Sequence, residues 1–338
     1  MHENASYDIQ EWKKKLARFE RPHLPSSVWQ VVNSVGPFLI LWMLAYLSLE
    51  ISVWLTLLCV IPAAGFLVRT FIIFHDCTHY SFFKSPKSNV VVGTMIGMLT
   101  LFPYKQWKRS HTMHHAANGN LEKRGVGDVW TMTLQEYSNA SWLKRLWYRI
   151  YRNPLVMFGV GPLYILFISS RINGKYATKR EKKHVWFTNL ALVMAGVILY
   201  LTLGWEAILF VELPALYLAA FAGVWLFYVQ HQFEDGYFEH KENWNYVEAA
   251  LKGSSFYKLP KVLQWFSGNI GYHHVHHLSS RVPNYHLEKA HKSDSRLQNV
   301  PTLTLLTSLK TLTFKLWDER SGKFIGNRDI RSFLQENH

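Results

Sequence analysis

The stretch Gly271-Tyr272-His273-His274-Val275-His276-His277 decides how this chain is interpreted, because it places four histidines within five residues. Two earlier stretches carry the same chemistry, His75-Asp76-Cys77-Thr78-His79 and His111-Thr112-Met113-His114-His115. Neutral imidazole is a common metal ligand, and residues three or four apart share one face of a helix. Each stretch lies beside a strongly apolar segment. The spacing therefore predicts three helical sets of convergent imidazoles that meet at one metal site.

The number of histidines bears on the number of metal ions. A structural zinc site uses four ligands and a catalytic zinc three, whereas eight imidazoles fit two ions of five or six coordinates each. Imidazole suits iron, copper, zinc and nickel alike, so the ligand type does not identify the metal. His274 directly follows His273 and would point about 100° away on a helix, so we do not expect it to be a ligand. The predicted ligands are His75, His79, His111, His114, His115, His273, His276 and His277.

The composition indicates a membrane protein. The chain of 338 residues is 49% hydrophobic, and its apolar residues are concentrated in blocks long enough to cross a bilayer. Its net charge of +14 includes basic runs that flank these blocks. Positive-inside topology and lipid headgroups explain that pattern, so we expect the membrane, and no nucleic acid, as a partner. Residues 1–27 are expected to form a basic arm, with an interfacial helix around Trp12–Phe19. The two cysteines, Cys59 and Cys77, fit neither a disulfide framework nor a Cys-based zinc site.

Four apolar blocks are expected to span the membrane as helices, in two hairpins. They cover residues 31–49, 53–74, 185–203 and 208–229. The outer turns of the hairpins carry Glu50 and Glu206 but no Lys or Arg, which is typical of turns outside the cytoplasm. This topology puts the three histidine stretches, together with His231, on one membrane face.

Two further apolar segments, residues 90–102 and 154–172, are predicted to associate with the membrane without crossing it. The first is too short for a span, and Pro and Gly residues weaken the first half of the second as a regular helix. The loop from Arg171 to Lys183 carries six basic residues and is therefore expected in the cytoplasm. The predicted architecture is a single all-α membrane domain over residues 1–338, with both termini cytoplasmic and a cytoplasmic helical cap made by residues 75–184 and 230–338.

The order His-x-x-x-His, His-x-x-His-His, His-x-x-His-His, with apolar hairpins between, resembles the membrane fatty acid desaturases. The stretches Phe74–His79 and Asn269–His277 resemble the acyl-lipid desaturases of Bacillus-type bacteria, which include a Δ5 desaturase. The stretches Gly127–Trp130 and Phe227–His231 share that likeness. The resemblance covers nearly the whole chain, and the three boxes together are highly specific to this superfamily.

The resemblance implies a function and a cofactor. It implies two iron ions held by histidines, with O2 as co-substrate and a cis double bond introduced into a saturated acyl chain of membrane phospholipid, at Δ5 by likeness alone. His231, at the end of the last apolar block, matches the family's additional ligand. The chain carries no haem, flavin or iron–sulfur motif, so a separate ferredoxin or flavodoxin is expected to supply two electrons. The implied location is the bacterial plasma membrane, with several crossings and the active site in the cytoplasm.

Other residues are expected to support the site. Asp76, Asp128, Glu234 and Asp235 are interpreted as partners that orient imidazoles, with a solvated face left open for the last two. Both ferredoxin and flavodoxin are typically acidic, and basic residues on the cytoplasmic face would complement them or contact lipid headgroups: Lys105, Lys108, Arg109, Lys144, Arg145, Lys258 and Lys261. The scattered histidines are assigned to the surface: His2, His23, His184, His240, His286, His291 and His338.

The boxes alone leave other functions open. Hydroxylases and other di-iron oxygenases share related boxes, so the reaction is not fixed by the ligands. A transporter of divalent metal ions is a second alternative, although transporters place polar ligands near the bilayer midplane on broken helices. A structural membrane protein whose helices are joined by metal is a third. Metal analysis of protein purified with iron available, together with a test for use of O2, would distinguish these three alternatives. The structural protein would bind zinc tightly and use no O2.

Overall fold

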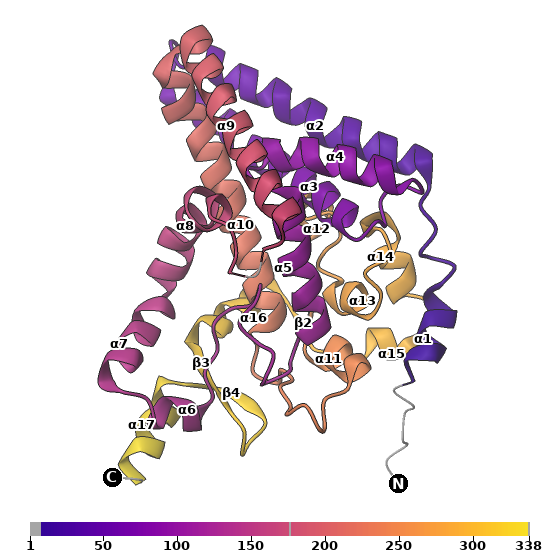
Figure 1. Ribbon diagram of the computed structural model, residues 1–338, viewed down its shortest axis with the longest axis vertical. Helices are drawn as coiled ribbons and strands as arrows, with labels where there is room; N and C mark the ends of the chain where they lie inside the picture. Colours follow the sequence, from indigo (N-terminus) through magenta and orange to yellow (C-terminus); the bar gives the residue numbers. More distant parts are fainter. Residues whose placement is uncertain (1–7, 176, 337–338) are drawn as a thin grey trace.

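The computed structural model describes residues 8–175 and 177–336. The described chain is mostly helical, with long apolar helices toward one end and short helices and two small sheets toward the other (Figure 1). Three stretches are long and apolar enough to cross a membrane: Leu24–Leu47, Val53–Thr78 and Lys179–His231. Many of their large apolar side chains are exposed, and an apolar surface of that extent needs lipid or another partner around it. The predicted all-α class with apolar candidate spans is therefore confirmed in outline.

The first hairpin consists of α2 (Leu24–Leu47) and α3 (Val53–Thr78). Ser52 ends the turn between them, because its side chain accepts a hydrogen bond from the backbone N–H of Trp54 and so caps α3. Helix α2 begins seven residues before the predicted block. Helix α3 continues past residue 74 through Thr78, so His75 lies on the last turns of the same helix that starts in the apolar region.

The second hairpin is built from one long apolar stretch. Helix α9 (Lys179–Glu206) passes into η3 (Ala207–Glu212) and α10 (Leu213–His231). A straight helix over these 53 residues would be about 80 Å long, far more than a hydrocarbon core of about 30 Å. Gly204 breaks it with φ 83° and ψ 173°, a conformation that glycine adopts readily. The chain reverses there, and both helices descend from the same end of the molecule (Figure 1).

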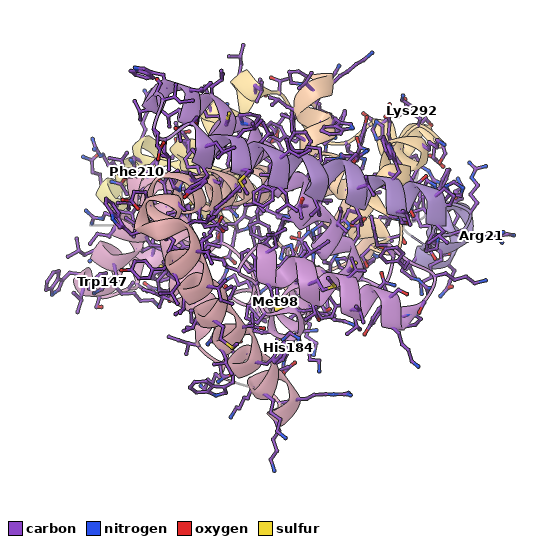
Figure 2. The ribbon with its side chains drawn as sticks, turned by 90° about the horizontal axis from the view of Figure 1, so that it is seen from above. Arg21, Met98, Trp147, His184, Phe210 and Lys292 are labelled. Atoms are coloured by element: carbon purple, nitrogen blue, oxygen red, sulfur yellow. The ribbon has the colours of Figure 1, made fainter. Side chains whose placement is uncertain are left out.

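The two hairpins meet near their turns. The indole N–H of Trp42 on α2 donates to the carboxylate of Glu212 at 2.6 Å, and apolar side chains of α2, α3 and α10 form a common core around them. Seen from above, α9 runs from the turn near Phe210 outward to His184 (Figure 2). The contact fixes the turns at one end of the molecule, while the histidines lie at the opposite ends of α3 and α10.

The two segments predicted not to span are short or broken. Helix α4 (Pro86–Leu99) has 14 residues, or about 21 Å. Beyond α7 (Trp142–Tyr151), the second segment forms three pieces: η1 (Leu155–Val160), α8 (Gly161–Phe167) and η2 (Ser169–Arg171). The expectation that Pro and Gly prevent a regular helix there is confirmed. Helix α7 and the second segment form a pair bent by 60°, and whether either segment crosses the membrane stays a prediction.

The N-terminal helix α1 (Ile9–Leu16) belongs to the cap. Trp12 is 2% exposed and packs with Leu16 in the same core as Val275 on the third histidine stretch. Arg296 pairs with Glu11 at 2.7 Å, and Lys15 pairs with Asp294 at 2.6 Å. A helix is therefore present close to the predicted residues, but its tryptophan is buried against protein and does not face lipid; whether α1 lies at the membrane surface stays a prediction.

We predict that Trp12→Ala lowers the apparent Tm, because emptying a core position of this size costs about 3–5 kcal/mol. Thermal unfolding of the detergent-solubilised protein measures the change. Trp54→Ala is the matched control, since Trp54 is 77% exposed and should have a much smaller effect. An equal Tm for Trp12→Ala and the wild type would show that α1 is not part of the folded cap.

The remaining elements form the cap around the histidines. Strands β1 (Phe256–Tyr257) and β2 (Thr302–Leu303) pair in parallel, and β3 (Phe314–Asp318) pairs antiparallel with β4 (Lys323–Gly326). Phe266, on α12, packs against Gly65 of α3. The helices of the cap are α5 (Tyr104–Ala117), α6 (Leu134–Ser138), α11 (Tyr246–Lys252), α12 (Lys261–Phe266), α13 (His273–Leu278), α14 (Asn284–His291), α15 (Ser295–Gln298), α16 (Leu305–Ser308), η4 (Leu309–Thr313) and α17 (Asn327–Glu336).

Candidate metal centre

The predicted histidines come together in two groups, at the junction between the long helices and the cap. Within each group the candidate ligand atoms all lie within 4.8 Å of one another. Helix α3 and its C-cap supply the first box, α5 the second and α13 the third, while α10 supplies His231. The first group consists of His75, His79, His111, His115 and His276, and the second of His114, His231, His273 and His277.

The ring nitrogens of each group face one another. In the first group the Nε2 atoms of His75 and His111 are 2.9 Å apart, and those of His115 and His276 are also 2.9 Å apart. In the second group Nε2 of His231 lies 3.1 Å from that of His114 and 2.9 Å from that of His273. Several imidazole nitrogens at such distances repel unless a proton or a cation lies between them, and a metal ion satisfies all of them at once.

Burial keeps these imidazoles neutral. Loss of solvation lowers the pKa values of six histidines well below the usual range, and neighbouring histidines lower them further: His79, His111, His115, His273, His276 and His277. The neutral ring is the form that binds metal. Nε2 of His79, a member of the first group, is also buried without a hydrogen-bond partner, which is unusual for a buried polar atom. The donor set therefore fits metal ions.

Three partners fix the outward-facing nitrogens of the ligands. Nδ1 of His75 lies 3.0 Å from Asp76, and Nδ1 of His114 is hydrogen-bonded to Asp128. Nδ1 of His231 donates to the backbone carbonyl of Gly253 at 3.1 Å. A proton on Nδ1 leaves the lone pair on Nε2, so these contacts aim Nε2 into each group.

The loop that carries Asp128 depends on a glycine. Gly127 has φ +74°, and a Cβ there would lie 2.9 Å from the carbonyl oxygen of Ser110 and 3.3 Å from His114. Only glycine lets the loop approach α5 this closely in that conformation. The backbone N–H of Gly125 also donates to Asp128 at 3.3 Å. The Gly127-Asp128 pair thus brings the carboxylate against His114.

Asp76 also connects two boxes. Its second oxygen accepts from the backbone N–H of Asn284 at 2.7 Å and from the side-chain amide of Asn284 at 2.8 Å. Asn284 begins helix α14, which follows the third box. Asn284 lies 208 residues from Asp76 in the sequence, and no local pattern indicated this contact.

Some of the assignments were wrong. Glu234 pairs with Lys310, and Asp235 pairs with Lys323 at 3.0 Å, so neither orients an imidazole and the solvated alternative holds. His291 was assigned to the surface but is buried, with Nδ1 at 3.1 Å from Nε2 of His274. His274 lies outside both groups, as expected from its direction on the helix.

The other scattered histidines differ in how far they are exposed to solvent. His23 and His240 are exposed, whereas His184 and His286 are half-buried. His240 lies between Glu122 at 2.6 Å and Glu319 at 3.0 Å, and these two hydrogen bonds raise its pKa. His2 and His338 lie outside the described residues.

The fold and the histidine groups define a helical, membrane-associated protein with a buried site that could hold metal ions. A model of the family described as "Fatty acid desaturase" matches residues 51–301. The chain is 54% identical over 318 residues to a fatty acid desaturase of Bacillus subtilis, covering 94% of this chain and 90% of that protein. It is 29% identical over 256 residues to the sn-1 oleoyl-lipid 12-desaturase of a Picosynechococcus species, covering 73% and 72%.

A plant protein shows the same likeness. The chain is 30% identical over 254 residues to the omega-3 fatty acid desaturase, endoplasmic reticulum, of Vigna radiata, covering 69% of this chain and 63% of that protein. This chain belongs to the fatty acid desaturase family. It is therefore an oxidoreductase that desaturates fatty acyl chains, and the transporter and structural alternatives are set aside.

Proposed function

We propose that this protein is a di-iron acyl-lipid desaturase. It uses O2 and two external electrons to place a cis double bond in a saturated acyl chain of membrane phospholipid, at Δ5. The observation that carries the proposal is the convergence of nine imidazoles into two buried groups. Two of the similar proteins are named as an sn-1 oleoyl-lipid 12-desaturase and an omega-3 fatty acid desaturase, which supports an acyl chain as substrate.

The residues in and around the two histidine groups would hold the metal ions, orient the imidazole rings and exclude water from the site. Iron, when bound by the nine histidines, supplies the activation of O2 and of the acyl C–H bond. Trp107 lies against His111 with ring centroids 4.3 Å apart, and Phe74 lies 5.1 Å from Trp107. These rings give the first group an apolar side toward α3. An alkyl chain is compatible with such a surface, and water is not.

Product analysis tests the reaction. The protein, expressed in a host that lacks its own desaturase, should convert saturated chains of phospholipids into cis-monounsaturated chains when O2 is present. Mass spectrometry of derivatised lipids locates the double bond, and we expect it at Δ5. A hydroxylated product would support the oxygenase alternative, and a double bond elsewhere would overturn the position but not the reaction.

We also propose the topology expected from the sequence. Four crossings in the bacterial plasma membrane would place both termini, the cap and the histidines in the cytoplasm. The two hairpin turns lie at one end of the protein through the Trp42–Glu212 contact. The bend in the segment after α7 and its short pieces support its position at the membrane surface.

Cysteine labelling should distinguish four crossings from five. Lys175→Cys, in the exposed loop before α9, should not react with a membrane-impermeant maleimide added outside intact cells. Ile51→Cys, at the tip of the first hairpin and 74% exposed, should react and serves as the control. Cys77 is buried, whereas Cys59 is half-buried, so both variants carry Cys59→Ser to limit background labelling. Efficient external labelling at residue 175 would mean that the segment of residues 154–172 crosses the membrane.

The electron donor is proposed to be an acidic ferredoxin or flavodoxin. The basic residues expected to contact the donor fall into two sets with different neighbours. Lys144 and Arg145 share α7 with the exposed Trp142 and Trp147, and Lys258 and Lys261 adjoin the exposed Val262. Apolar neighbours of this kind suit the lipid surface. The remaining three basic residues, Lys105, Lys108 and Arg109, lie on α5, which also carries the second histidine box. We propose this helix as the docking face for the electron donor.

Turnover driven by reduced acidic ferredoxin should fall as ionic strength rises, mainly through the apparent KM for the donor. Opposite charges raise the association rate, and salt screens them within about 10 Å at 0.1 M. Lys105→Glu with Lys108→Glu should reproduce the loss at low salt, whereas Lys289→Glu on α14 should not. A KM indifferent to salt and to both reversals would exclude electrostatic docking on α5.

A further inference from the structure

The two histidine groups offer different numbers of ligands. The first brings together five imidazoles and the second four. Metal ions that activate small molecules keep coordination positions open. With ions of the same coordination number in both groups, the four-histidine group leaves one more position for a ligand that is not protein.

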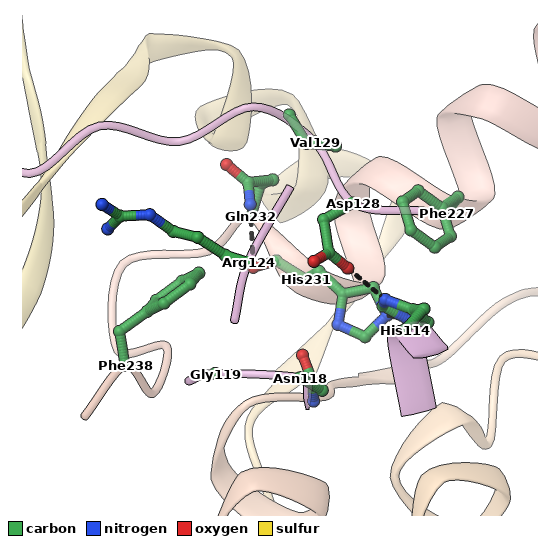
Figure 3. A pocket seen from close by; sticks show the side chains of 10 residues that line it. All are labelled: His114, Asn118, Gly119, Arg124, Asp128, Val129, Phe227, His231, Gln232 and Phe238. Carbon is green, nitrogen blue, oxygen red and sulfur yellow. Dashed lines mark hydrogen bonds and ion pairs between the residues drawn. The ribbon is translucent and has the colours of Figure 1, made fainter. Parts of the chain in front are cut away.

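A cavity adjoins only the four-histidine group. It has a volume of about 20 Å³ and is lined by His114 and His231, with no member of the five-histidine group among its walls (Figure 3). A cavity needs roughly 10–15 Å³ to hold one water molecule. This cavity therefore has room for water or part of a small ion, and it is far too small for an acyl chain.

The walls of the cavity change in character along its length. At the inner end, Phe227 places its ring 5.1 Å from that of His114 and 5.2 Å from that of His231. Asp128, which fixes His114, also lies there. Asn118 and Gln232 line the cavity further along, and Figure 3 shows Arg124 and Phe238 on the side away from His114. The cavity thus connects two ligand rings to a polar and charged region.

Arg124 offers an unused donor. One of its terminal nitrogens pairs with Glu136, while the other, Nη1, is buried without a hydrogen-bond partner. A buried N–H of a guanidinium group needs an acceptor. Water or a small anion in the cavity would supply one, and an apolar gas would not.

We propose that this cavity is the aqueous port through which water and small anions reach the metal of the four-histidine group. The inference rests on the proposed di-iron function. In that reaction the acyl chain gives up two hydrogens and the donor two electrons. Reduction of O2 with two further protons then yields two waters. The acyl chain is apolar, so the protons and the waters need a separate polar route, and this cavity touches two of the ligands, His114 and His231.

Azide is the probe for this port, because an anion cannot reach the metal through the membrane. It should bind the oxidised, iron-loaded protein and produce a new charge-transfer absorption band. Val129→Phe and Phe238→Trp enlarge side chains on different parts of the wall. Each should slow azide association about tenfold or more, which corresponds to about 1.4 kcal/mol in activation free energy, with iron content unchanged.

A second small cavity provides the control. It is lined by Leu134, Gln135 and Arg320 among others and touches no histidine, so Gln135→Phe should leave azide binding unchanged. If azide fails to bind the wild type loaded with two irons, or associates with both wall variants as fast as with the wild type, the port is wrong while the di-iron proposal stands. If the protein holds only one iron, the two-metal proposal fails, and the port fails with it.

Discussion

Replacing His276 by alanine should abolish desaturation and release metal. His276 contributes to the five-histidine group, where its Nε2 lies 2.9 Å from that of His115. Removing it takes away a donor and opens a buried space beside the remaining imidazoles. The loss should exceed the roughly 10–100-fold that follows removal of an orienting partner. Iron content and product formation, measured on membranes with equal protein, report the two effects.

The neighbouring histidine supplies the matched control. His274→Ala lies two positions away on the same helix, but His274 contacts His291 and belongs to neither group. That variant should keep its iron and substantial activity, even if it is less stable. Full activity in His276→Ala would remove the third box from the metal site.

Asp128→Asn should lower activity or iron affinity by about 10–100-fold. The carboxylate of Asp128 accepts from Nδ1 of His114 and so directs Nε2 into the four-histidine group. The asparagine amide has an N–H donor as well as an oxygen acceptor. If its N–H faces Nδ1 of His114, the ring proton shifts to Nε2, and the tautomer of His114 is reversed. Titration of the purified protein with Fe²⁺ under anaerobic conditions gives the affinity.

Glu234→Gln is the control for Asp128→Asn. Glu234 pairs with Lys310 on the surface, where an ion pair contributes at most about 1 kcal/mol. Its iron affinity should equal that of the wild type. If Asp128→Asn also matched the wild type, the carboxylate would not be needed to orient His114.

The sequence was sufficient to predict which histidines converge, because the spacing within each box is local. His111, His114 and His115 lie on one helix, so their spacing alone predicts a shared direction. The apolar blocks were also recognisable, since length and hydropathy need no tertiary information. The turn at Gly204 was placed by the short polar break in the second hairpin.

The errors concern contacts between distant segments. Trp12 packs against the third box, His291 against His274, and Asn284 against Asp76, and none of these pairs is visible from local periodicity. Glu234 and Asp235 lie close to His231 in sequence, yet the chain turns after α10 and leaves both in ion pairs near the surface. Proximity in sequence identified Asp76 correctly, because it lies on the same helix as His75, but it was misleading for Glu234 and Asp235 beyond the end of α10.

The metal content of the purified protein distinguishes a di-iron centre from a zinc site. After expression with iron available, elemental analysis should find two iron ions per chain. Removal of either histidine group, through His79→Ala with His276→Ala or through His231→Ala with His277→Ala, should leave fewer. One tightly bound zinc ion per chain, with no dependence of lipid unsaturation on O2, would contradict a di-iron desaturase.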